Sequence, residues 1–190
     1  TEIFAAKTHA PRFCMLQYSS EVRAVFVTTH VGYAEVPAML TTAAILDTIE
    51  LGAQAIRRIL GGEPRIVVLG LNPHAGENGL FGTEEQATII PAIERARGDG
   101  IQVDGPLSAD IVFIDAKQKG TNGIVAMYHD QGLIPVKMDA EGVGVNVTLG
   151  IPILRASVDH GTAYDIVGKG LASDKSLLKA ISLAYKLIKN

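Results

Sequence analysis

The sequence of 190 residues has a single cysteine and no tryptophan. One cysteine excludes a disulfide within the chain, and this usage is typical of a protein from the reducing cytoplasm. The residue, Cys14, lies in the apolar run Phe13-Cys14-Met15-Leu16. We therefore expect a buried thiol here and a cytoplasmic protein.

Long hydrophobic runs and a strong charge of one sign are missing too. No apolar stretch reaches the roughly 18 residues that cross a membrane, and no signal-peptide pattern opens the chain. The net charge is −3, with 17 lysine and arginine residues scattered along the sequence. These properties predict neither a membrane partner nor a nucleic-acid partner.

Two further patterns are absent. No Gly-x-Gly-x-x-Gly fingerprint follows a predicted strand, so a dinucleotide, if one binds, binds by a scheme other than the Rossmann one. No initiator methionine precedes Thr1. We therefore expect the chain to be part of a longer protein.

Short apolar runs alternate with amphipathic segments. The runs predict strands at residues 13–18, 22–29, 66–71, 101–104, 111–114, 123–128, 143–149 and 153–157. Helices are expected from Thr41 or Thr42 to Leu60, from Thr83 to near Gly98, and from Ser173 or Asp174 to near Ile188. The side chains expected to face inward from the first and last of these are Ile45, Ile49, Ile56 and Ile59, and Leu177, Ile181, Ala184 and Ile188. The order predicts an α/β fold with a mostly parallel sheet covered by helices.

Three histidines each follow a short apolar run: His30, His74 and His129. In open α/β sheets, ligands bind outside the carboxyl ends of the strands. Three imidazoles are the right number and type of ligand for a catalytic metal that keeps one position open. We therefore predict a metal site formed by these side chains.

His74 lies in a glycine-rich loop, residues 72–83, that leads into a helix. Its glycines let the backbone approach a ligand closely, and the helix N-terminus favours an anion. Glu77 in this loop could orient a ligand or bind a cation. The plainer alternative is a tight connection with a surface histidine, but the other two strand-end histidines favour the ligand-binding interpretation.

Further polar side chains are expected near the same edge of the sheet. Asp130 follows His129 and could set its tautomer or bind substrate, and a turn at 105–110 brings Asp110 there. Candidates for clamping a phosphate or carboxylate near successive strand ends are Lys137, Asn146 and Arg155. The alternatives are helix capping for the aspartates and a solvated surface position for each of the other three.

The following motifs occur in order: Thr1-Glu2, Thr28-Thr29-His30, Gly70-Leu71-Asn72-Pro73-His74-Ala75-Gly76-Glu77, Gly105-Pro106-Leu107, Ala126-Met127-Tyr128-His129-Asp130-Gln131-Gly132, Val145-Asn146-Val147-Thr148-Leu149-Gly150 and Ser157-Val158-Asp159-His160-Gly161-Thr162-Ala163. Together they resemble the 4-hydroxythreonine-4-phosphate dehydrogenase family of vitamin B6 biosynthesis, in the isopropylmalate-dehydrogenase-like superfamily. The resemblance covers essentially the whole chain.

The resemblance implies a site shared by two copies. In that family, the residues matching His30, His74 and His129 bind a divalent metal, with the third supplied across a dimer interface, so we expect His129 to come from a partner chain. We therefore expect a homodimer and a metal such as Zn, Mg, Co or Mn. Substrate contacts are implied for Thr1, Lys137, Asn146 and Arg155. The candidates for catalytic roles are Asp110, Asp130 and Lys137.

The segment from His160 to Gly170 is similar to the His-Gly-Ser-Ala-Pro-Asp-Ile-Ala-Gly-Lys-Gly element of isopropylmalate and isocitrate dehydrogenases, which cradles the adenosine of NAD. This likeness implies that NAD, or NADP in its place, is bound by His160, Gly161, Thr162, Ala163 and Asp165. The implied fold is a three-layer α/β fold of the isopropylmalate-dehydrogenase type, with the chain covering the C-terminal part of a two-lobed enzyme. Residues 1–155 are expected to form the metal-binding, substrate-binding and dimerisation lobe. Residues 156–190 should supply the NAD loop and a C-terminal helix that packs on the missing N-terminal lobe.

The implied activity is an NAD- and metal-dependent oxidation, with decarboxylation, of 4-phosphooxy-L-threonine. A sister group with the same motifs oxidises threonate or erythronate 4-phosphate. A non-catalytic fragment that only dimerises or binds phosphate is another alternative. A related phosphate acetyl- or butyryltransferase shares the architecture but needs no metal, and the three histidines argue against it.

Overall fold

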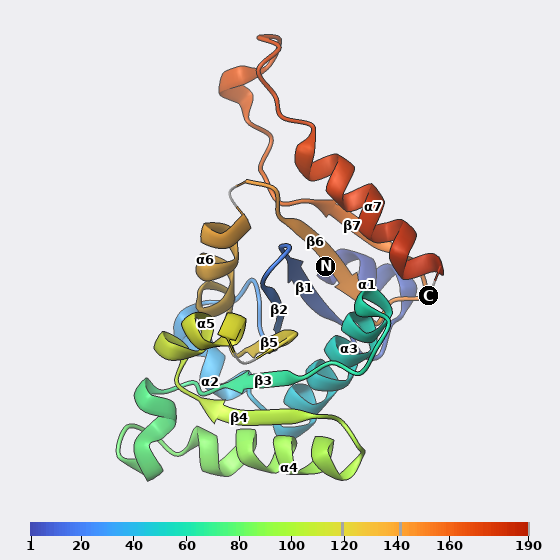
Figure 1. The fold of residues 1–190 in the computed structure, drawn as a ribbon. Helices are drawn as coiled ribbons and strands as arrows, with labels where there is room; N and C mark the ends of the chain where they lie inside the picture. The colour runs from blue at the N-terminus through green and yellow to red at the C-terminus, as the bar shows by residue number, and fades with distance from the viewer. Residues whose placement is uncertain (119, 141, 190) are drawn as a thin grey trace.

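The computed structural model describes residues 1–118, 120–140 and 142–189 (Figure 1). Its strands are β1 (Cys14–Tyr18), β2 (Arg23–Phe26), β3 (Ile66–Leu69), β4 (Val103–Leu107), β5 (Gly123–Ala126), β6 (Val145–Leu149) and β7 (Arg155–Val158). Its α-helices are α1 (Glu2–Thr8), α2 (Val36–Met39), α3 (Thr42–Leu60), α4 (Ile90–Gly98), α5 (Ala109–Gln118), α6 (His129–Ala140) and α7 (Lys175–Lys189). Shorter helical turns are η1 (Tyr33–Glu35), η2 (Pro73–Gly79), η3 (Glu85–Ile89) and η4 (Tyr164–Ile166). Apart from the strand expected at 111–114, each predicted strand overlaps one of these.

The strands form one sheet in the order β4-β3-β5-β2-β1-β6-β7. Strands β4, β3, β5 and β2 run parallel to one another, whereas β2–β1, β1–β6 and β6–β7 are antiparallel pairs. The prediction of a mostly parallel sheet is therefore wrong for one half of it. The reason is local, because β1 and β2 form a hairpin in which Ser19 N–H donates to the Val22 carbonyl at 2.8 Å, and a hairpin joins antiparallel strands.

Helices cover both faces of this sheet, which confirms the three-layer fold (Figure 1). Helices α3, α4 and α7 share one core with strand residues such as Leu16 and Val68. Helices α5 and α6 share the other core with residues such as Met15 and Phe26. The neighbours Met15 and Leu16 lie in different cores because successive strand residues point to opposite faces.

The apolar stripe read from the sequence predicts the buried face of α3 correctly but not that of α7. In α3 the predicted inward residues are buried, as the pattern required: Ile45, Ile49, Ile56 and Ile59. In α7 the prediction is wrong by one position, since the buried residues are Ser176, Ala180, Leu183 and Leu187. Three of the four predicted inward residues are instead exposed, namely Leu177, Ile181 and Ile188. Helix α7 has two adjacent apolar stripes, and its contacts with β6, β7 and α3 select one of them.

Residues 111–114 form part of α5 rather than the predicted strand. The helix begins just after Ser108, whose carbonyl accepts a hydrogen bond from Val112 N–H at 3.2 Å. Val112 is buried while Ile111 is half exposed, so this apolar run is an amphipathic turn of helix. The turn predicted at 105–110 is also wrong, because strand β4 continues to Leu107 and Asp110 lies in the first turn of α5.

Helix α6 was not expected from the sequence, because Gly132 and Pro135 lie inside it. It forms because tertiary packing outweighs these unfavourable residues: a Cβ on Gly132 would lie 2.7 Å from the ring of Phe26, so the glycine lets α6 approach the sheet closely. This packing fixes the position of the helix that begins at His129.

The Cys14 side chain is buried, as predicted. Burial raises the pKa of its thiol to about 12, and the charge of Asp47 adds to this shift. In the described part of the chain, no single helix is long and apolar enough to span a membrane. One pair, Tyr33–Met39 with Thr42–Leu60, passes on length and composition but is bent by 93°.

Candidate active site

His30 and His129 lie together at one edge of the sheet. Strands β2 and β5 are parallel neighbours, so their carboxyl ends lie at the same edge. His30 follows β2 in a loop, and His129 is the first residue of α6, just after β5. Their ring centroids are 5.7 Å apart. The structure thus brings two of the three predicted ligands to one place within one chain, whereas we expected His129 to come from the partner.

Each of these imidazoles has a carboxylate partner on the same ring nitrogen. His30 Nδ1 lies 3.1 Å from Glu2 Oε1, and His129 Nδ1 lies 2.6 Å from Asp130 Oδ1. Ligating histidines characteristically donate the other N–H to a carboxylate, which fixes the tautomer and makes the ring more basic. With Nδ1 bound in this way, Nε2 of each ring carries the free lone pair. The donor set therefore fits a divalent cation.

Glu2 is held as a carboxylate beside His30. Partial burial raises its pKa, but hydrogen bonds with its own backbone, Thr29 and His30 outweigh this effect, and the pKa falls to about 2. The Thr29 hydroxyl donates to Glu2 Oε1 at 2.7 Å. The sequence motif Thr1-Glu2 is therefore at the site, although Thr1 itself is the residue that precedes α1.

His74 lies on a different loop, in η2 after β3. Its ring is 6.1 Å from that of Phe81, and it contributes to a lowered pKa of Asp110, whose largest cause is a hydrogen bond from Ser108. Within the described residues, no three His, Cys, Asp or Glu side chains lie close enough together to hold a metal ion. In one chain, then, His74 and Asp110 form a group separate from the His30–His129 pair.

The His74 loop has an unusual backbone and a buried support that the sequence did not reveal. Six successive residues, 74–79, have positive φ, a conformation that persists only where the surroundings enforce it. Glu85 is 2% exposed and accepts hydrogen bonds from the N–H groups of Leu71 and Asn72, both at 2.8 Å. A Cβ on Gly76 would lie 2.6 Å from Glu85 Oε2. Glu85 thus fixes the loop that carries His74, and its only sequence signal was its place near a predicted helix start.

A pocket of about 240 Å³ lies next to the histidine pair. The predicted site residues among its lining are His30, His129, Asn146, Arg155 and His160. Arg155 Nη1 donates to Asn146 Oδ1 at 2.9 Å and to Thr148 Oγ1 at 3.1 Å. The guanidinium also lies 5.2 Å from the centre of the Phe4 ring. A fixed guanidinium and an amide in one pocket suit a phosphate or carboxylate.

The predicted positions of the anion-binding residues need correction. Asn146 lies within β6 and Arg155 begins β7, so these two are neighbours across an antiparallel pair and not at successive strand ends. Lys137 is on α6, exposed to solvent. Its charge acts on Asp159, whose pKa is raised by burial and lowered in part by Lys137. Asn146 and Arg155 line the pocket, and the charge of Lys137 reaches it through Asp159, which also lines it.

The predicted NAD loop begins at this pocket and leads away from it. His160 lines the pocket, and its neighbours in the loop are exposed: Gly161, Thr162, Ala163 and Asp165. A Cβ on Gly161 would meet no atom within 4 Å. In Figure 1 the segment between β7 and α7 extends beyond the end of the sheet. Its backbone is therefore accessible to a ligand.

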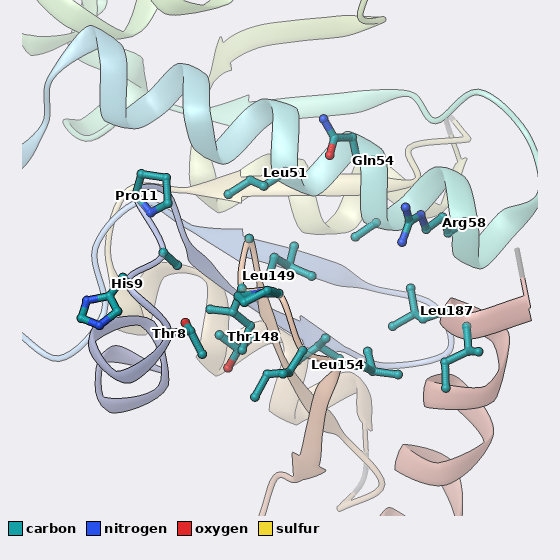
Figure 2. Close-up of a pocket in the computed structure, with 18 residues that line it drawn as sticks. Thr8, His9, Pro11, Leu51, Gln54, Arg58, Thr148, Leu149, Leu154 and Leu187 are labelled. Carbon is teal, nitrogen blue, oxygen red and sulfur yellow. The ribbon is translucent and has the colours of Figure 1, made fainter.

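A larger cavity of about 720 Å³ lies elsewhere and contains none of the predicted site residues. Figure 2 shows it between α1, α3, α7 and the loop after β6, with side chains such as Leu51, Leu154 and Leu187 around it. Its lining is largely apolar, with His9 and Arg58 at its border. This cavity is larger than the pocket beside the histidine pair, but the histidine, asparagine and arginine side chains predicted for the site line the smaller pocket.

The fold is an α/β fold of the isopropylmalate-dehydrogenase-like type. A β-decarboxylating dehydrogenase from Thermococcus kodakarensis has this fold, with a TM-score of 0.59 and 15% identity over 98% of this chain and 60% of its own. The family model of the pyridoxal phosphate biosynthetic protein PdxA matches residues 1–184. The chain belongs to that family.

Named relatives are similar over almost the whole chain. A 4-hydroxythreonine-4-phosphate dehydrogenase of Desulforapulum autotrophicum is 50% identical over 97% of this chain and 54% of its own length. A D-threonate 4-phosphate dehydrogenase of Cupriavidus necator is 47% identical over 98% and 56%. The crystal structure of the 4-hydroxythreonine-4-phosphate dehydrogenase from Klebsiella pneumoniae has a TM-score of 0.87 and 39% identity, covering 100% of this chain and 57% of that one. The chain thus spans little more than half the length of these relatives.

Proposed function

We propose that this chain is the C-terminal part of a dehydrogenase that uses NAD and a divalent metal to oxidise and decarboxylate a four-carbon hydroxy acid phosphorylated at O4. Family membership and the names of the relatives support a dehydrogenase with a phosphorylated substrate. The observation that carries the proposal is the His30–His129 pair, with both Nδ1 atoms bound to carboxylates, next to the pocket of Arg155.

The metal site in this proposal is shared between two copies of the chain. His30 and His129 of one copy supply two Nε2 atoms, and His74 comes from the partner, since within one chain it lies apart from them. A dimer interface is supported by exposed apolar side chains on β4, α5 and α6, namely Leu107, Ile111, Ile114, Ile134 and Met138. Large exposed apolar areas on proteins mark interaction surfaces.

When bound, a divalent cation such as Zn, Mg, Co or Mn would stabilise negative charge on the oxygen at C3 of the substrate, and NAD would accept the hydride. The chain's own residues prepare this step. Arg155 and Asn146 bind an anionic group of the substrate, and Lys137 adds positive charge at the edge of the pocket. Asp130 orients His129, and Asp110 accompanies His74 as a candidate for holding the amino group or moving the proton. The resulting β-keto acid loses its carboxylate as CO₂.

The segment from His160 to Asp165 binds the adenosine half of NAD, or of NADP, in this proposal. Two features support it: the exposed backbone around Gly161 and the position of His160 at the substrate pocket. The exposed stripe of α7, with Leu177, Ile181 and Ile188, would then face the lobe that completes the nucleotide site. In this arrangement, residues 1–155 bind the metal and the substrate, and residues 156–190 bind NAD.

The substrate is 4-phosphooxy-L-threonine in our proposal, with threonate or erythronate 4-phosphate as the alternative, since relatives of both names are almost equally similar. The test is an assay of the full-length protein with NAD and Zn²⁺, Mg²⁺, Co²⁺ or Mn²⁺ on each compound, measuring reduced nicotinamide and released CO₂. We expect reduction with at least one of them, together with CO₂. A folded, metal-loaded protein that reduces NAD with none of them would refute the proposal and favour a binding role.

A further inference from the structure

Gln17 is a buried polar residue in an otherwise apolar strand. It is 0% exposed and lies in β1 among Cys14, Met15 and Leu16. Its side-chain Oε1 accepts a hydrogen bond from Asn146 Nδ2 at 3.5 Å. No residue in the described part of the chain accepts a hydrogen bond from its Nε2. A buried amide is unfavourable unless it is hydrogen-bonded, so an apolar residue of similar size would fit this position better on packing grounds alone.

The position of Gln17 links it to the anion-binding residues. It is the register partner of Asn146 across β1 and β6, and both line the 240 Å³ pocket. Asn146 Oδ1 in turn accepts a hydrogen bond from Arg155 Nη1 at 2.9 Å. Gln17, Asn146 and Arg155 therefore form a continuous series of side-chain contacts along the wall of the pocket.

The amide of Asn146 has two orientations of nearly equal shape, which exchange Oδ1 and Nδ2. Only one presents an acceptor to Arg155, because the other would place two N–H donors against each other. The Oε1 atom of Gln17 selects the productive orientation by accepting from Nδ2. Asp159 lies near the Gln17 amide: burial raises the pKa of its carboxyl, and Gln17 is among the neighbours that lower it in part.

We propose that Gln17 is a positioning residue for the anionic group of the substrate: it holds Asn146 in the orientation that fixes the Arg155 guanidinium in the pocket. This inference rests on the proposed function, in which Arg155 and Asn146 bind a phosphate or carboxylate. It predicts that Gln17 acts through Asn146 and not by direct contact with the ligand.

The test is a double-mutant cycle in the full-length protein with inorganic phosphate as the probe, measured by calorimetry. Gln17→Met removes both polar atoms at similar volume. We expect it to weaken phosphate binding about three- to tenfold and to raise the KM of the phosphorylated substrate similarly, with kcat unchanged. In an Asn146→Ala background the same substitution should change nothing further. Leu16→Met, on the opposite face of β1, is the matched packing control and should leave phosphate affinity intact.

The outcomes separate this inference from the proposed function. Two results would overturn the role of Gln17 but leave the proposed function intact. In the first, Gln17→Met weakens phosphate binding equally in the wild-type and Asn146→Ala backgrounds. In the second, Gln17→Met has no effect although Arg155→Ala weakens phosphate binding. If Arg155→Ala and Asn146→Ala also leave phosphate binding unchanged, the anion site of the proposed function is wrong as well. If thermal unfolding shows that the Gln17→Met variant is not folded, Gln17→Leu is used instead. Its effect on phosphate binding should depend on Asn146 in the same way.

Discussion

The imidazole of His129 and the carboxylate of Asp130 are neighbours in sequence and are hydrogen-bonded, with Nδ1 and Oδ1 2.6 Å apart. The first turn of α6 thus contains both a proposed metal ligand and the group that orients it. The pair His30–Glu2 has the same arrangement, although its partners are 28 positions apart in the sequence. Because both rings have Nδ1 bound to a carboxylate, their two Nε2 atoms are available to one shared cation.

Replacing Asp130 by asparagine should weaken metal binding by about 10- to 100-fold, because partners of this kind tune ligand basicity and orientation. Competition with a chelator, followed by metal analysis of the protein, measures the effect. Asp99→Asn, at the end of α4, removes a carboxylate far from the site and serves as the control. Equal metal affinity in the two variants would show that Asp130 does not support a ligand.

Arg155→Ala should raise the KM of the phosphorylated substrate by about 10- to 150-fold, since charge-assisted hydrogen bonds contribute about 1.5–3 kcal/mol. The KM of NAD should stay the same. A surface control is Arg57→Ala, which breaks only the ion pair with Glu63. If steady-state kinetics give the same substrate KM for both variants, the anion binds elsewhere.

His160→Ala should raise the KM of NAD about tenfold or more without changing the metal content. Adenosine lies far from the reacting carbon, so its contacts stabilise ground and transition states alike. The full-length protein is required, because the loop is exposed in this chain. A variant that loses metal but binds NAD normally would assign His160 to the metal site instead.

The raised pKa of Cys14 predicts a pH dependence of stability. Its thiol has a pKa of about 12 when folded, against 9.0 for the unperturbed group. The folded state therefore retains the proton, and the contribution to stability is complete below pH 9 and is lost as the pH rises from about 9 to 12. Native protein at pH 8 should react slowly with a thiol reagent, and urea-unfolded protein quickly. Fast reaction of the native protein would contradict the burial of this side chain.

The sequence could predict the parts of the fold that depend on local patterns. The apolar stripe of α3 predicted four of its buried residues correctly, and the three histidines could be identified because each follows an apolar run. The sequence could not show which of the two apolar stripes of α7 is buried. It also did not predict helix α6, because Gly132 and Pro135 lie inside it. In both cases contacts with distant segments decide the structure.

Site residues that belong to no motif could not be predicted from the sequence for the same reason. Glu85 and Gln17 gain their roles only through partners brought together by folding, at Asn72 and Asn146. Conversely, two of the residues that the sequence predicted to bind an anion, Asn146 and Arg155, do line one pocket, although their positions in the strands were wrongly assigned and Lys137 is not among the lining residues. Chemistry was easier to predict than geometry.

The proposed metal site is built from His30 and His129 of one copy and His74 of another, and mixing of inactive variants tests this arrangement most directly. His74→Ala and His129→Ala, refolded together, leave one intact site in each mixed dimer, so metal binding and NAD reduction should return. His30→Ala with His129→Ala should restore nothing, because each site then lacks one ligand. Recovery in the second mixture, or its absence in the first despite mixed dimers, would contradict the shared site.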